Sequence, residues 1–174
     1  SKRGTAPCKA TCPAHVGIQG YIALINEGKY AEALQLFKEA HPFPGICGRV
    51  CHHPCEQVCT RGDVEEPIAI RELHRYLSDW EQTHQAPYVP EIKEKRDEKV
   101  AIIGSGPAGL TAAFYLALAG YQVPIFEKLP KAGGMMRYGI PEYRLPRSII
   151  DTEIGVIEQM GVTIKTGVAF GSDF

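Results

Sequence analysis

Six cysteines dominate the chemistry that this sequence could perform, because all of them lie in the first third of its 174 residues. Clustered thiols in a reducing compartment favour metal ligation over disulfide bonds. Two of them form Cys8-x3-Cys12-Pro13, which has the shape of the last part of the bacterial ferredoxin motif for 4Fe–4S clusters. The other four follow at intervals of four residues: Cys47, Cys51, Cys55 and Cys59.

The cysteine spacing leaves two kinds of metal centre open, an iron–sulfur cluster and a structural zinc ion. A spacing of four puts neighbouring thiols on one helix face, but Pro54 argues against one continuous helix, so Cys51 and Cys55 should straddle a turn. Zinc favours paired short knuckles, which the second group matches loosely. The ferredoxin-like first group favours iron–sulfur. For Cys47 alone, a buried unligated cysteine is also a reasonable interpretation.

A glycine-rich loop carries the second chemical signal. Gly-x-Gly-x-x-Gly at 104–109 follows an apolar strand pattern and precedes a helical one, which is the context that a dinucleotide-binding loop needs. Gly104 would allow the tight turn, Gly106 would let a pyrophosphate approach, and Gly109 would let the helix pack against the strand. Glu127, 23 residues after Gly104, would bond ribose hydroxyls and disfavour a 2′-phosphate. The spacing alone does not separate FAD from NAD.

Two regions must position these groups. Apolar spacing predicts helices in the first region from Ile18, from Tyr30 to near His41, and over 67–82, after an irregular lead-in at 1–13. The charge run 93–99 marks a boundary, so we expect a helical domain at 1–84, a linker at 85–98 and a Rossmann-type domain at 99–174. The second region is expected to alternate strands and helices: strand 100–103, helix 108–119, strand 122–126, helix 147–160 and strand 162–166. Pro124 is awkward inside its strand because it cannot donate to the ladder.

Composition excludes several classes of function. The formal net charge is −1, which gives no electrostatic reason to expect nucleic acid or an anionic membrane surface as a partner. No apolar run is long enough to cross a bilayer, and nothing resembles a signal peptide. We therefore expect a cytoplasmic protein without membrane insertion.

The motifs resemble those of one known family. The chain is similar to the small subunit of glutamate synthase and to the N-terminal part of dihydropyrimidine dehydrogenase. The resemblance covers nearly all residues and is most specific at 8–13, 46–51, 66–70, 100–110 and 133–146. It implies an α-helical domain with 4Fe–4S clusters, an incomplete α/β Rossmann-type FAD domain, and an NADPH domain that this chain lacks. It assigns FAD to Gly104, Ser105, Gly106, Pro107, Ala108, Gly109, Glu127, Gly134, Met135 and Arg144.

The resemblance also implies how the cysteines divide between clusters. Cys12, Cys51 and Cys55 would share one cluster, whose fourth ligand is a glutamine in the dehydrogenase relative. The position aligned with that glutamine is His74, which would otherwise be a satisfied core histidine. The second cluster would take Cys8 and Cys59, but its other two cysteines belong to an upstream C-x2-C that is absent here. Cys47 would substitute as a ligand or simply pack.

The expected function is electron transfer between flavin, clusters and a redox partner subunit or a ferredoxin-like acceptor, within an NAD(P)H oxidoreductase. No catalytic acid, base or nucleophile is expected, because the cofactors carry the chemistry. The fragment alone should be inactive. The alternative is a docking module that joins a flavoprotein to a catalytic subunit, with structural zinc or a cluster.

Overall fold

A computed structural model describes residues 4–85, 87–92 and 94–171. The chain divides into two compact units, a helical unit that ends at Tyr88 and a sheet unit that begins at Val89. This division lies inside the range 85–98, while the three domain ranges expected from the sequence stay a prediction. No helix of the described residues is long and apolar enough to cross a membrane.

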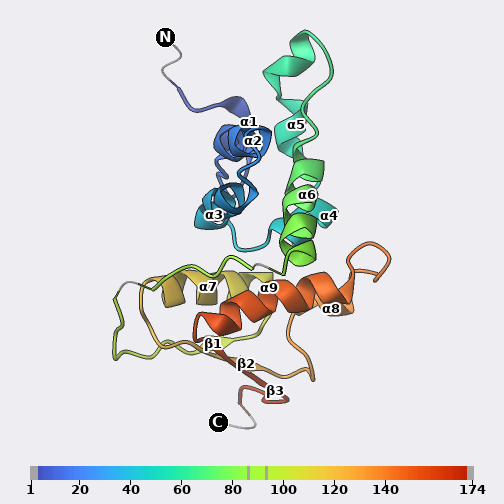
Figure 1. Cartoon of the computed structure of the whole chain (residues 1–174). Helices are drawn as coiled ribbons and strands as arrows, with labels where there is room; N and C mark the ends of the chain where they lie inside the picture. The colour runs from blue at the N-terminus through green and yellow to red at the C-terminus, as the bar shows by residue number, and fades with distance from the viewer. Residues whose placement is uncertain (1–3, 86, 93, 172–174) are drawn as a thin grey trace. The chain divides into compact units, whose positions relative to one another are not determined.

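The helical unit is built from short helices, shown in Figure 1. They are α1 (Pro7–Thr11), α2 (Ile18–Asn26), α3 (Tyr30–Ala40), α4 (Pro44–Val50), α5 (Pro54–Gln57) and α6 (Ile70–Thr83), with a 3₁₀ helix η1 (Thr60–Asp63). Helix α2 packs against α3, α4 packs against α6, and α1 packs against α5. The thiol-bearing α4 is therefore held by the long α6, while the short α1 and α5 pack against each other.

The core of the helical unit follows the predicted apolar faces. It contains Ile18 and Tyr21 from α2, Leu34 and Phe37 from α3, and Leu77 from α6. Prolines start the short helices α1, α4 and α5, where a missing N–H costs no hydrogen bond. The gap between α4 and α5 confirms that Cys51 and Cys55 straddle a break in the helix.

Two expectations for this unit were wrong at the element boundaries. The lead-in is not wholly irregular, because α1 forms over Pro7–Thr11 with proline in its first turn. Helix α6 begins at Ile70 rather than at Pro67. Proline is suited to a first turn but does not require one, and here Pro67 lies in the loop before the helix.

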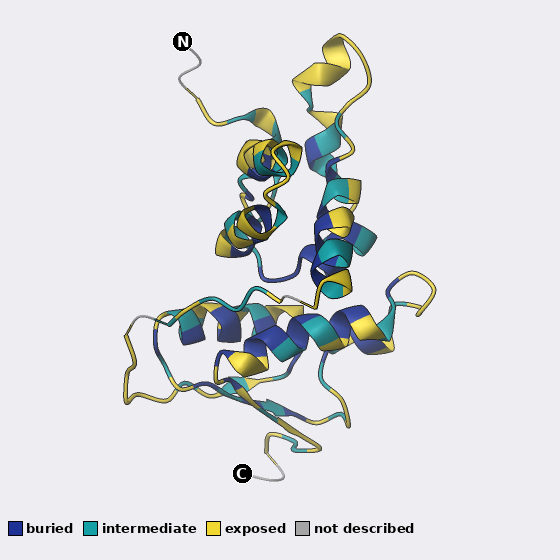
Figure 2. Ribbon diagram, viewed as in Figure 1, coloured by how far each residue is buried: buried dark blue, intermediate teal, exposed yellow. Residues whose placement is uncertain are grey.

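The sheet unit is a parallel three-stranded sheet in the order β1 (Ile102–Ile103), β2 (Pro124–Glu127) and β3 (Thr163–Thr166). Helix α7 (Pro107–Leu118) connects the first pair of strands and α9 (Arg147–Gln159) the second, with the short α8 (Met135–Tyr138) between β2 and α9. Helices α7 and α9 contact each other, and in Figure 2 buried residues run along both. This alternation of parallel strands and helices is the expected Rossmann-type arrangement.

The strands are shorter than predicted. Strand β1 covers Ile102 and Ile103 only, and β2 begins at Pro124 rather than at Gln122. Pro124 is tolerated because it is the first residue of the strand. It lies opposite Thr163 in register, and the neighbouring Val123 carbonyl accepts the Thr163 N–H at 3.1 Å.

Candidate functional site

Three of the cysteines lie at the ends of short helices: Cys51 follows α4, Cys55 lies in α5, and Cys12 follows α1, which packs against α5. None of the six cysteines is joined by a disulfide bond in the described part of the chain. Burial raises the pKa of the Cys55 thiol to about 11, and Cys12, Glu56 and Cys51 add to the shift. Cys12 comes from the end of α1, so segments about 40 residues apart in sequence meet here. These are the three cysteines that the resemblance places in one cluster.

A second set of thiols surrounds the phenol of Tyr21 on α2. Burial raises the pKa of Tyr21, and the nearby thiols of Cys55, Cys8, Cys47 and Cys12 raise it further. These cysteines come from α1, α4 and α5, and they pack against the same apolar core. Thiols far apart in sequence thus converge on one side of α2.

Cys8 and Cys59 share the wall of a cavity of about 450 Å³. The lining also includes Ile18, Ile22 and Ile70, so the cavity is largely apolar. The two cysteines that the resemblance assigns to a second cluster therefore face one common space in this unit.

His74 is buried on α6 at 4 % exposure. Neither of its ring nitrogens has a hydrogen-bond partner among the described residues. Burial lowers the pKa of His74 to about 3, with a smaller contribution from His41, so the imidazole is neutral and keeps a lone pair. A satisfied core histidine would have its nitrogens hydrogen-bonded, whereas a metal ligand needs this neutral form.

A close helix crossing brings α4 against α6. A Cβ atom on Gly48 would lie 2.5 Å from the backbone nitrogen of Arg75, so only glycine permits this approach. Gly48 follows Cys47 and Arg75 follows His74, so the crossing brings the thiol-bearing helix to the histidine-bearing one. The ring of His74 in turn lies 5.3 Å from that of Tyr21, centroid to centroid.

The donor set of this unit suits an iron–sulfur cluster. Among the described residues, no three His, Cys, Asp or Glu side chains gather closely enough to hold one metal ion. A cubane cluster takes its cysteine ligands on four separate irons, and the unpaired nitrogens of His74 lie in the same unit as the thiols.

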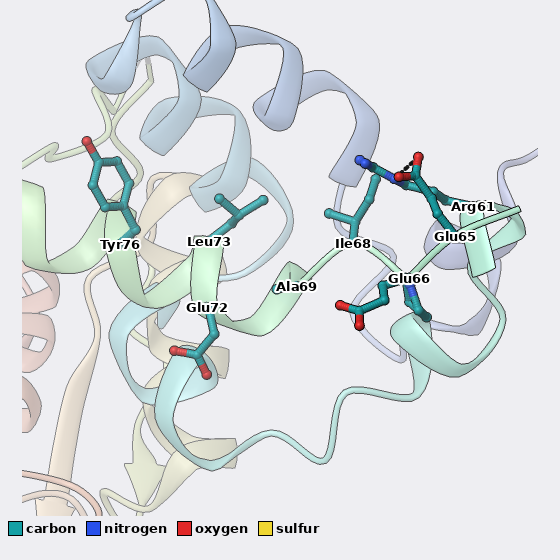
Figure 3. Close-up of a pocket in the computed structure, with 9 residues that line it drawn as sticks. Arg61, Glu65, Glu66, Ile68, Ala69, Glu72, Leu73 and Tyr76 are labelled. Carbon is teal, nitrogen blue, oxygen red and sulfur yellow. Dashed lines mark hydrogen bonds and ion pairs between the residues drawn. The ribbon is translucent and has the colours of Figure 1, made fainter.

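A further groove of the helical unit lacks this chemistry. Figure 3 shows the Arg61–Glu65 ion pair at one end and Tyr76 at the other, with Ile68 and Leu73 between them. The groove measures about 760 Å³ and contains no cysteine or histidine in its lining. The thiol groups therefore lie elsewhere in this unit.

In the sheet unit, the glycine loop has the predicted geometry. Gly104 has φ +91°, which favours glycine, and an added Cβ at Gly109 would lie 2.1 Å from the Gly104 carbonyl oxygen. An added Cβ at Gly106 would meet nothing within 4 Å. Pro107 and Ala108, which are exposed, open helix α7, whose N-terminal amides and dipole favour a phosphate.

Glu127 is buried at the end of β2 and is already hydrogen-bonded. Its carboxylate accepts the Ser105 N–H at 2.8 Å and hydroxyl at 2.5 Å, and the Leu129 N–H at 2.9 Å. Burial alone would raise the pKa of Glu127, but these hydrogen bonds outweigh it and hold the pKa below its usual value. An ionised carboxylate has about four acceptor positions, so ribose hydroxyls can still be bound.

The second glycine stretch abuts the first. Gly134 has φ +50°, and an added Cβ there would lie 2.7 Å from the Gly106 Cα. Ser105 links the loops, because its backbone and side-chain oxygens both accept the Gly133 N–H, at 3.0 and 3.2 Å. Met135 is 71 % exposed and Arg144 is also exposed.

Sequence reasoning missed three contributors to these sites. Tyr21 lies in the helix predicted from Ile18 and Gly48 in the specific stretch 46–51, but neither role was predicted, since the partners of both residues are distant in sequence. His53 has φ +48°, and its backbone N–H donates to the Cys51 sulfur at 3.3 Å. No sequence signal identifies such a bond before the loop conformation is known.

Comparison with known proteins adds family assignments to this geometry. Residues 2–86 match the family described as dihydropyrimidine dehydrogenase domain II, 4Fe–4S cluster. Residues 102–154 match the NAD(P)-binding Rossmann-like domain. The expected similarity to dihydropyrimidine dehydrogenase is thereby confirmed.

Three curated relatives cover nearly all of this chain. The beta subunit of NADP(+)-dependent formate dehydrogenase from Moorella thermoacetica is 45 % identical over 97 % of the chain and 27 % of the relative. The beta subunit of NADPH-Fe(3+) oxidoreductase from Geobacter sulfurreducens is 45 % identical over 97 % of the chain and 25 % of the relative. Subunit PreT of NAD-dependent dihydropyrimidine dehydrogenase from Salmonella typhimurium is 41 % identical over 95 % of the chain and 40 % of the relative.

The chain thus spans about a quarter to two fifths of the length of these relatives. Its two units correspond to the two matched families in order, with the thiols in the first and the glycine loop in the second. The chain therefore comprises a helical segment that matches the dihydropyrimidine dehydrogenase domain II, 4Fe–4S cluster family, followed by a segment that matches the NAD(P)-binding Rossmann-like domain, and its relatives are oxidoreductase subunits.

Proposed function

We propose that this chain is the electron-transfer segment of an FAD- and 4Fe–4S-containing NAD(P)H:acceptor oxidoreductase. One cluster is bound by Cys12, Cys51 and Cys55 with His74 as fourth ligand. A second cluster uses Cys8 and Cys59 together with ligands from outside this chain. Cys47 packs beside the first cluster or replaces a ligand.

The observation that supports this proposal is the packing of Cys8, Cys12, Cys47 and Cys55 around the core cluster that contains Tyr21. Several thiolates close together repel one another, and burial raises the pKa of Cys55. Iron supplies the positive charge that keeps such thiolates deprotonated. The neutral, unpaired imidazole of His74 supports its role as the remaining ligand.

For the sheet unit, we propose FAD as the dinucleotide. The matched family is named for NAD(P), so FAD rests on the resemblance to glutamate synthase small subunits. Gly104 to Gly109 would hold the pyrophosphate over the start of α7, and Glu127 would hold a ribose. Gly134, Met135 and Arg144 would line the flavin side, for which the two exposed side chains are available.

The chain's own residues bind, orient and insulate; the cofactors, when bound, supply the one- and two-electron chemistry. The backbone N–H of His53 donates to the Cys51 sulfur, and such bonds raise cluster potential. NADPH would bind to a further domain of the whole protein. The acceptor would be a redox partner subunit or a ferredoxin-like protein, and the setting cytoplasmic without nucleic acid.

The test is anaerobic reduction of the full-length parent protein by NADPH. We expect bleaching of flavin absorption followed by loss of the broad iron–sulfur absorption near 400 nm. Flavin bleaching without any iron–sulfur change, with zinc bound in place of iron, would overturn the proposal and favour a docking module. The control is a Glu66→Gln variant, because Glu66 lines the groove that contains no cysteine. Its flavin and iron–sulfur absorption should bleach as in wild type.

A further inference from the structure

The phenol of Tyr21 is unusually placed for a core residue. Its exposure is 0 %, and its hydroxyl has no hydrogen-bond partner among the described residues. A buried hydroxyl without a partner costs about 1–3 kcal/mol, so native proteins rarely leave one unpaired. The hydroxyl therefore needs an acceptor.

The neighbours of Tyr21 limit what that acceptor can be. Its ring packs against Phe37 with centroids 5.9 Å apart and against His74 at 5.3 Å. Cys55 belongs to the same buried core cluster as Tyr21, and three further thiols, those of Cys8, Cys12 and Cys47, pack against that cluster. If His74 gives its lone pair to iron, as proposed above, sulfur is the acceptor chemistry left around this phenol.

The phenol carries an O–H that can donate a hydrogen bond, and this hydroxyl is unpaired among the described residues. A proton pointed at a sulfur stabilises the more negative, reduced state of an iron–sulfur cluster.

We propose that the Tyr21 hydroxyl donates a hydrogen bond to a sulfur of the cluster in the helical unit and thereby raises its reduction potential. This inference rests on the proposed function, because it requires the cluster. Tyr21 is a positioning and tuning residue, and the ligands are unaffected by its loss. Phenylalanine at this position preserves the ring contacts with Phe37 and His74.

The test is an EPR-monitored redox titration of the anaerobically reconstituted full-length protein. In the Tyr21→Phe variant, the ratio of reduced to oxidised cluster at a fixed potential should fall about tenfold, equivalent to a midpoint about 59 mV lower. The Tyr30→Phe variant is the matched control. Tyr30 lies in the same unit, with its ring 5.6 Å from that of Tyr76, and its loss should leave the midpoint unchanged.

The outcomes separate the inference from the proposed function. If Tyr21→Phe keeps its cluster and its midpoint, the inference is wrong and the proposed function stands. If wild-type protein shows no iron–sulfur EPR signal, both fail. If Tyr21→Phe does not fold, the test uses wild-type protein whose tyrosines carry deuterium on the ring carbons beside the hydroxyl. ENDOR coupling between these deuterons and the cluster supports the inference. The absence of this coupling overturns the inference.

Discussion

The crossing of α4 and α6 gives a sharp test of how the fold builds the cluster site. In Gly48→Ala, the new Cβ would lie 2.5 Å from the Arg75 nitrogen and 2.7 Å from its Cα, where 3.4 Å begins ordinary contact. The helices must therefore separate by about 0.9 Å, which as overpacking costs about 1–3 kcal/mol. The gain in helix propensity returns at most about 1 kcal/mol. We expect a net loss of stability together with a lower iron content.

Two measurements check this prediction: urea unfolding of the metal-free protein and iron content after anaerobic reconstitution. The control is Gly155→Ala on α9, where an added Cβ meets nothing within 4 Å. Since alanine is favoured over glycine in a helix, the control should gain up to about 1 kcal/mol and bind iron as wild type does. If Gly48→Ala matches wild type in both stability and iron, the crossing does not position the ligands as we argue.

Three further predictions follow from buried polar groups. Lys38→Met removes the Lys38–Glu81 ion pair, 2.5 Å long with side chains 1 % and 3 % exposed, and should cost about 3–5 kcal/mol in thermal unfolding because Glu81 stays buried and charged. Adding Glu81→Leu should recover most of that loss, and a single variant as stable as wild type would contradict the argument. Metal-free protein should lose stability as pH falls from 6.5 to about 4. Burial lowers the pKa of His41 to about 4 and also lowers that of His74, so in this pH range both histidines bind protons in the unfolded chain but not in the folded one. Urea unfolding at several pH values measures this slope, which His74→Gln should reduce; an unchanged slope would refute it. Glu127→Gln should weaken FAD binding about tenfold or more in a fluorescence titration, because a charged acceptor is lost, whereas unchanged affinity would remove Glu127 from the ribose site.

The sequence allowed prediction of those features that depend on local pattern. The helical faces around Tyr21, Phe37 and Leu77 were predictable because apolar spacing of three and four residues defines a buried stripe. The glycine loop was predictable because Gly104 and Gly109 meet steric demands within one strand–turn–helix unit.

Features that depend on contacts between distant segments could not be predicted. The Lys38–Glu81 pair joins residues 43 apart, and nothing in either helix alone marks its partner. The same holds for Gly48 and for the hydroxyl of Tyr21, whose importance appears only when α4, α5 and α6 come together. Boundaries such as the start of α6 depended on loop packing that helix propensity does not describe.

The central claim is that the clustered thiols of the helical unit bind inorganic iron and sulfide. The most direct measurement is the content of iron and acid-labile sulfide in the anaerobically reconstituted chain. The account predicts equal amounts, about four of each per cluster bound. Stoichiometric zinc with no sulfide would contradict it.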